Sequence, residues 1–168
     1  VPSLIDFNLN SSFNQILYDK MDMKNVKGGL VVKNKSVCMK DLFMELCDGT
    51  MMVNGSYTTV NVKVPSIDFD LDISNFDIPK SFETFNSMKK MAPIMETSYG
   101  SFSTHFNVIS DLNQNMEPIY SSMNGGGGFQ TKEVLIKGSK TIDKMADLLK
   151  NDKYKELTLQ DINATFEF

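Results

Sequence analysis

The chain has 168 residues, 41% of them hydrophobic and 23% charged, an ordinary composition for one globular domain with its own core. Its net charge is −4 and its 17 basic residues are all lysines, which disfavours nucleic-acid binding because such contacts depend on arginine and clustered positive charge. No apolar run approaches the roughly 20 residues of a membrane-spanning helix.

Strands predominate in the first half of the chain. Apolar stretches separated by Asn, Asp and Gly are typical of antiparallel hairpins, and we expect turns at Asn34-Lys35 and Asp48-Gly49. The predicted strands cover residues 4–10, 30–32, 37–46, 51–57 and 67–73, and a looser apolar segment covers 13–18. We expect the strand at 67–73 to pair onto the hairpins before it.

This strand at 67–73 alternates without interruption between apolar and acidic side chains. Ile67, Phe69, Leu71 and Ile73 stand at odd positions, and three aspartates stand between them. Successive side chains of a strand point to opposite faces of the sheet. The pattern therefore predicts a sheet with one apolar face and one polar face.

Two helical patterns interrupt the strands in the second half. Between residues 78 and 92 apolar side chains recur at spacings of three and four, Asp77 can cap the first turn, and Pro93 forces a stop. A second pattern covers 141–151. Further strands are predicted at 102–108, 129–136 and 162–168, with a polar loop at 110–124.

These helices are too few to cover the apolar face. A helix covers a strip about 10 Å wide, whereas seven or eight strands at about 4.8 Å spacing make a sheet about 35 Å wide. The sheet must fold on itself as a sandwich, or part of its apolar face must stay open. The predicted fold class is mainly β (α+β), a curved antiparallel sheet with an apolar, groove-like inner face and two short helices.

Three patterns resemble known sites without meeting their requirements. Asp68, Asp70 and Asp72 suggest calcium, but the outer two are about 13 Å apart on a strand and cannot share one ion. The glycine run 125–128 lacks the Gly-Lys-Ser/Thr of a phosphate-binding loop, so we expect a flexible turn or bulge. His105 has no nucleophile motif beside it, which makes a hydrolase the least favoured function. No catalytic residue, metal site or cofactor is predicted.

Short motifs follow one another along nearly the whole chain. They are Val26-Lys27-Gly28-Gly29-Leu30, Asp48-Gly49-Thr50, Asn54-Gly55-Ser56-Tyr57, Ile67-Asp68-Phe69-Asp70-Leu71, Phe76-Asp77-Ile78, Met91-Ala92-Pro93-Ile94, Gly100-Ser101-Phe102-Ser103-Thr104, Asn124-Gly125 and Ala146-Asp147-Leu148-Leu149-Lys150. In their order and spacing the chain resembles the AsmA family, in particular the C-terminal AsmA-like region of Gram-negative envelope proteins. It departs from that pattern at Gly126 and Gly128, where side chains are expected.

This resemblance implies a periplasmic location and a parent protein anchored in the inner membrane by an N-terminal helix. Members of the family form an elongated apolar groove and are linked to outer-membrane biogenesis and phospholipid transport. The family supplies no catalytic residues. We therefore expect residues 1–168 to be a single AsmA-like domain without enzymatic activity, a part of a longer membrane-anchored protein.

The function expected first is the binding or conduction of a phospholipid or another acyl-chain lipid. The expected acyl-chain contacts are Ile67, Phe69, Leu71, Ile73, Phe102, Phe106, Phe166 and Phe168. The alternative is a structural or interaction scaffold with a dry, packed core and no ligand. The first and last strands both resemble cut edges of a continuing sheet, so we also expect edge-strand self-association.

Overall fold

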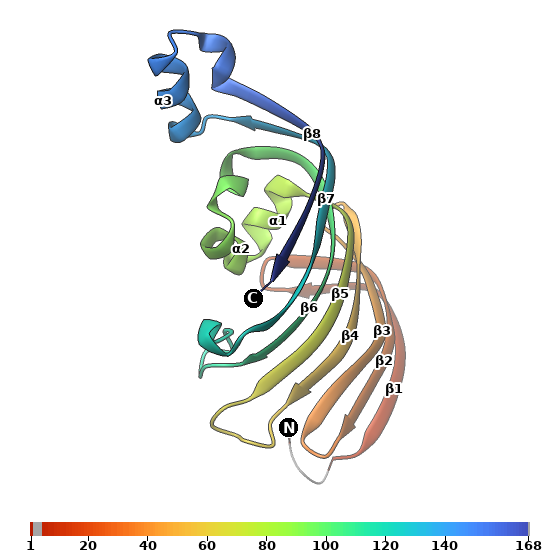
Figure 1. The fold of residues 1–168 in the computed structure, drawn as a ribbon. Helices are drawn as coiled ribbons and strands as arrows, with labels where there is room; N and C mark the ends of the chain where they lie inside the picture. The colour runs from red at the N-terminus through yellow and green to blue at the C-terminus, as the bar shows by residue number, and fades with distance from the viewer. Residues whose placement is uncertain (2–4, 168) are drawn as a thin grey trace.

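The computed structural model describes residue 1 and residues 5–167, with their side chains except those of residues 87, 90 and 91. This part of the chain forms one antiparallel sheet of eight strands, paired in sequence order. The strands are β1 (Phe7–Tyr18), β2 (Met21–Lys33), β3 (Ser36–Leu46), β4 (Gly49–Thr58), β5 (Ser66–Asp77), β6 (Ser98–Asp111), β7 (Asn124–Lys137) and β8 (Glu156–Glu167). The sheet is open, with β1 and β8 at its two edges (Figure 1).

The sheet is strongly curved, and two short helices lie on its concave side (Figure 1). These helices, α1 (Ile78–Thr84) and α2 (Asn86–Met91), follow β5, and a third, α3 (Lys140–Leu148), lies between β7 and β8. The predicted fold class is therefore confirmed, with helices in the two regions where helical patterns were found. The strands do not divide into the two layers of a sandwich, because they all belong to one sheet.

The curvature coincides with breaks in strand register. Pairing shifts occur between β2 and β3, β3 and β4, β5 and β6, and β6 and β7. Close to these shifts Asn25, Asp41 and Asn75 have left-handed backbone conformations, with φ of 49°, 50° and 55°. A bulge bends its strand and increases the local twist, and Asn and Asp tolerate positive φ better than most residues. Short polar residues inside the strands thus mark where the sheet bends.

The first predicted helix begins as expected and then divides. The Asp77 carboxylate caps α1 by accepting a hydrogen bond from the backbone N–H of Lys80 at 2.9 Å. Phe85 then takes an extended conformation, and its ring stacks on Phe76 with centroids 6.4 Å apart. The prediction of one continuous helix is wrong at this point, because tertiary packing of an aromatic ring outweighs the helical pattern.

The core lies where α1 and α2 meet the sheet. Phe76 and Ile78 are almost completely buried there. The ring of Phe102 lies 6.1 Å from that of Phe76 and 5.5 Å from that of Phe129, measured between centroids. An aromatic row therefore crosses β5, β6 and β7 at the end of the sheet that carries α1 and α2.

Several strands are longer than predicted. β1 continues through the looser segment to Tyr18, β2 begins at Met21, and β8 begins at Glu156. The glycine run 125–128 forms the beginning of β7 and pairs with β6 in unbroken register, so the prediction of a flexible turn or bulge there is wrong. Once a neighbouring strand is in place, backbone groups gain hydrogen-bond partners whatever side chains they carry, and pairing extends through polar or glycine-rich stretches.

β7 and β8 also reach beyond the other strands, and the helical connection between them forms a separate tip (Figure 1). This connection contains α3 and a 3₁₀ helix, Asp152–Lys155, which pack against each other. α3 confirms the second predicted helix. Among the described residues, no helix combines the length and the apolar character needed to cross a membrane.

Candidate functional site

Seven of the eight predicted acyl-chain contacts lie on one side of the sheet. Residues directly opposite each other in an antiparallel pair share a face. Leu71 pairs with Phe106, Phe106 with Gly127, and Gly127 with Phe166. The same side carries Ile67, Phe69, Ile73 and Phe102. Phe102 belongs to the core and Phe69, Leu71 and Ile73 pack against it, so this side is the one that carries α1 and α2 (Figure 1), and we call it the concave face. Phe168, the eighth contact, lies outside the described residues.

The concave face is covered at one end and open at the other. Phe102 is buried between Phe76 and Phe129, and α1 packs on its strand, so this predicted contact belongs to the core. The other six described contacts are half-buried: Ile67, Phe69, Leu71, Ile73, Phe106 and Phe166. Phe69, Leu71 and Ile73 pack against the core, and all six still expose part of their apolar surface to solvent.

Apolar rows extend from these residues across the sheet to β1. One row of paired residues contains Phe7, Val32, Val37, Tyr57 and Ile67, one from each of the first five strands. A second row contains Leu9, Leu30, Met39, Gly55 and Phe69. The apolar character of the concave face therefore continues unbroken from β5 to the edge of the sheet.

The most exposed part of this face lies on β1, which the sequence analysis did not select. Phe7 is 46% exposed and Phe13 is 45% exposed, and Leu9 between them is exposed as well. The alternation at Phe7 and Leu9 is visible in the sequence. What the sequence does not show is that β1 lies farthest from the strand preceding α1, at the margin that these helices leave open.

Gly127 brings two of the predicted contacts together. Phe106 and Phe166 stand on β6 and β8, on either side of this glycine, and their ring centroids are 6.1 Å apart. A Cβ atom on Gly127 would lie 2.4 Å from the Cβ of Phe106 and 2.2 Å from the carbonyl oxygen of His105. The glycine therefore leaves the space that the two rings share.

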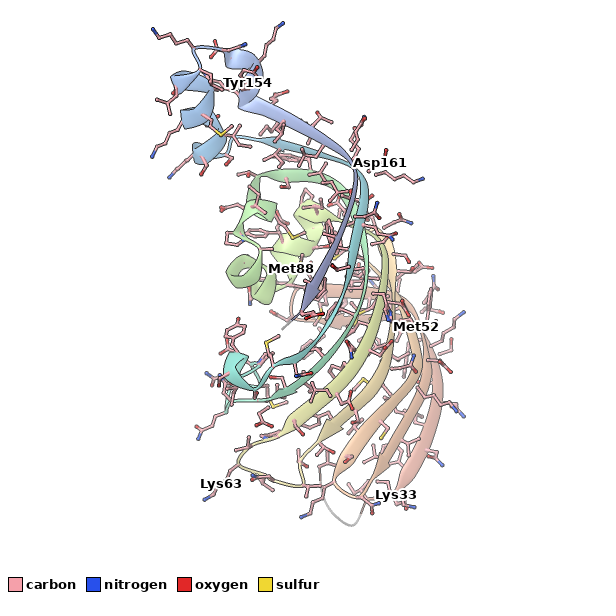
Figure 2. All side chains as sticks on the ribbon, in the orientation of Figure 1. Lys33, Met52, Lys63, Met88, Tyr154 and Asp161 are labelled. Atoms are coloured by element: carbon pink, nitrogen blue, oxygen red, sulfur yellow. The ribbon has the colours of Figure 1, made fainter. Side chains whose placement is uncertain are left out.

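The opposite, convex face is polar. Asp68, Asp70 and Asp72 are exposed there, as is Met52, which pairs with Asp72 and points away from the helices (Figure 2). His105 pairs with Asp72 across the strands, and its Nδ1 lies 2.8 Å from the Asp72 Oδ1. The sequence analysis missed this contact, because the register between β5 and β6 cannot be read from either strand alone.

Among the described residues, Asp70, Asp72 and His105 are the group that could hold a metal ion. Their potential ligand atoms lie within 4.8 Å of one another. Ligands around one zinc ion are closer, about 3.3 Å apart for tetrahedral bonds of about 2.0 Å. All three side chains are exposed, and the pairing of an imidazole with two carboxylates accounts for their positions.

A polar pocket of about 630 Å³ lies where the β3–β4 turn meets α1. Its lining includes Lys20, Lys24 and Lys80 as well as Asp48 and Glu83. The hydrogen bond to the Asp48 carboxylate raises the pKa of Lys80 above its ordinary value. Because both signs of charge line this pocket, it does not select an anionic or a cationic ligand.

The concave face is consequently the candidate functional site. It is the large apolar surface of the sheet, whereas on the convex face His105 pairs with Asp70 and Asp72, and in the pocket Lys80 pairs with Asp48. No protein-family model, curated protein or solved structure matches this chain, so its function has to be inferred from these residues.

Proposed function

We propose that the concave face binds the acyl chains of a phospholipid or a similar lipid. The observation that carries this proposal is the set of apolar rows that run unbroken from β5 to the exposed side chains of β1. Exposed apolar patches of this kind mark binding surfaces more often than isolated exposed side chains do. Lipid tails suit such a surface, because they need apolar contact and few directional polar groups.

The energetics support the same ligand class. Each buried methylene group contributes about 0.8 kcal/mol, so ten methylenes placed on the concave face would contribute about 8 kcal/mol before the cost of ordering the lipid. Phe7, Leu9 and Phe13 would lose the solvent contact that they now have. A lipid could therefore bind without a closed cavity around it.

The proposal extends to the family and the location of the protein. An open, curved antiparallel sheet with an apolar concave face (Figure 1) is compatible with the elongated apolar groove that the AsmA resemblance implies. Within this proposal the chain is a non-enzymatic, lipid-conducting segment of a periplasmic protein that is anchored in the inner membrane. Its role would belong to outer-membrane biogenesis.

A photocrosslinking experiment tests the lipid contact. Phe106 is replaced by p-benzoylphenylalanine, the protein is irradiated with vesicles of phosphatidylethanolamine and phosphatidylglycerol, and crosslinked lipid is detected by mass spectrometry. We expect Leu71→Asp, at the directly paired position, to reduce the yield at least tenfold. Met52→Asp serves as the matched control, because it adds the same charge to the convex face, and should leave the yield unchanged.

The folded state of each variant is checked by circular dichroism and thermal unfolding. If Leu71→Asp does not fold, the test moves to β1, with the crosslinker at Phe7 and the substitution Leu9→Asp, since both side chains are exposed. Equal crosslinking in the folded concave-face variant and the parent would contradict lipid binding, and so would no crosslinking in the parent. The latter result favours the scaffold function instead.

A further inference from the structure

The connection between β7 and β8 carries a second apolar surface, separate from the concave face. It consists of α3 and the following 3₁₀ helix, residues 140–155, which we call the tip. Figure 1 shows the tip beyond α1 and α2, at the far end of β7 and β8. It therefore lies at one extremity of the molecule, where a partner can reach it without disturbing the core.

Three apolar side chains of α3 form one exposed stripe. Met145, Leu148 and Leu149 are spaced by three and four residues, so they are neighbours on one face of the helix. They are 52%, 83% and 58% exposed, whereas Ala146 on the adjoining face is buried. The exposed Tyr154 of the 3₁₀ helix belongs to the same tip (Figure 2). Exposing such a cluster of apolar side chains to water is energetically unfavourable, and clusters of this kind mark surfaces that bind a protein or a membrane.

The charge of the tip is opposite to that of the rest of the protein. Residues 140–155 contain five lysines and three aspartates, a net charge of +2, while the whole chain has a net charge of −4. The five lysines are all exposed. One of them, Lys155, lies 2.7 Å from Asp152 and 3.8 Å from Asp147, and the hydrogen bond lowers the pKa of Asp152. The contact with Asp147 joins the 3₁₀ helix to α3, whereas the contact with Asp152 lies within the 3₁₀ helix.

We propose that the tip docks on the surface of an anionic lipid bilayer, with Leu148 and Leu149 inserted among the headgroups. A short amphipathic helix with apolar side chains on one face and lysines around them is the form of interfacial membrane anchors. Lysines extend their ammonium groups to anionic lipids while their stems cover apolar surface. Tyrosine is enriched at the interface between membrane and water, where Tyr154 would lie.

A second copy of this chain is a poorer partner for the tip. Two tips brought face to face would oppose two surfaces that each carry a net charge of +2. An anionic bilayer satisfies both the charge and the apolar side chains. This docking goes beyond the proposed lipid binding and does not require it, because it uses different residues.

Vesicle flotation tests the proposal. The protein is mixed with phosphatidylcholine vesicles that contain either no phosphatidylglycerol or about one third of it. We expect the parent to float with the anionic vesicles, with at least tenfold less bound to the neutral ones. The bound fraction of the double variant L148D/L149D on the anionic vesicles should be at least tenfold lower than that of the parent. The matched control V60D/V62D places two aspartates at exposed valines of the β4–β5 loop and should float like the parent.

Four outcomes would overturn the docking. The first is that the parent does not float with anionic vesicles, and the second is that L148D/L149D floats as well as the parent. The third is that V60D/V62D loses as much vesicle binding as L148D/L149D does. The fourth is that the parent binds no vesicles but forms a dimer in sedimentation equilibrium, and that L148D/L149D dissociates this dimer. The last result would make the tip a self-association surface. Lipid crosslinking at Phe106 reports on the concave face and not on the tip. A protein that crosslinks lipid at Phe106 but does not float with vesicles would therefore contradict docking of the tip and leave the proposed lipid binding intact.

Discussion

The absence of a side chain at Gly127 allows its neighbours in the sheet to approach closely. This glycine occupies the position between Phe106 and Phe166, and its neighbours approach so closely that a Cβ atom would meet backbone and side chain at 2.2 Å and 2.4 Å. The next residue differs, since a Cβ atom on Gly128 would lie 3.9 Å from its nearest neighbour, the Ala164 carbonyl oxygen. Two adjacent glycines thus have different roles.

We expect Gly127→Ala to lower the free energy of unfolding by about 1–3 kcal/mol, because the added methyl group forces strands β6 and β7 apart. Gly128→Ala is the matched control and should change stability by less than about 1 kcal/mol. Urea unfolding monitored by circular dichroism measures both. Equal effects of the two substitutions would show that flexibility of the run, and not the space at Gly127, is what matters.

The two edge strands expose the hydrogen-bonding groups of an open sheet. β1 and β8 each have a described neighbour on one side only. Natural sheets commonly protect such edges with lysine or proline, whereas β8 carries neither between Glu156 and Glu167. The outer backbone of β8 can therefore pair with a strand from another chain, which is the self-association expected from the sequence.

We expect the protein to associate edge to edge at high concentration, and Ala164→Lys to weaken this association at least tenfold. Ala164 is exposed on β8, and an inward-facing lysine at an edge opposes strand addition. Gln130→Lys adds the same charge to the neighbouring interior strand and should leave the association unchanged. Sedimentation velocity over a concentration series gives the answer. A parent that stays monomeric at millimolar concentration excludes edge pairing.

The described part of the molecule is a row of hairpins in which each of the eight strands pairs only with its sequence neighbours. Stability in such an arrangement depends on local interfaces and need not be uniform, as in repeat proteins. The aromatic row lies on β5, β6 and β7, with Phe76 and Phe102 buried, while β1 carries exposed aromatic side chains. We therefore expect the sheet to be most stable in β5, β6 and β7, at the end that carries α1 and α2.

Amide hydrogen exchange should record this gradient. We expect protection factors at least tenfold higher in β5 and β6 than in β1, because the backbone of β1 can separate from the sheet without opening the core. Peptide-resolved mass spectrometry measures the exchange of each strand. Equal protection across the sheet would mean that the eight strands unfold as one cooperative unit.

The sequence by itself determined the two faces of the sheet and much of the order of strands and helices along the chain. Strict alternation in residues 67–73 requires an apolar and a polar face, whatever the neighbouring strands are. The cap at Asp77 and the proline at 93 set the limits of the first helical region, because they act through local backbone chemistry. Local rules therefore sufficed for the class of the fold and for the face of the sheet on which the candidate residues lie.

Only the tertiary structure decided which part of the apolar face is covered. Strand register buries Phe102 beneath the helices, leaves Phe7 open at the edge, and places His105 beside Asp72. The break at Phe85 likewise depends on a ring contact with Phe76. Each of these outcomes depends on groups that are distant in the chain, and their packing energy cannot be obtained from the pattern of one segment.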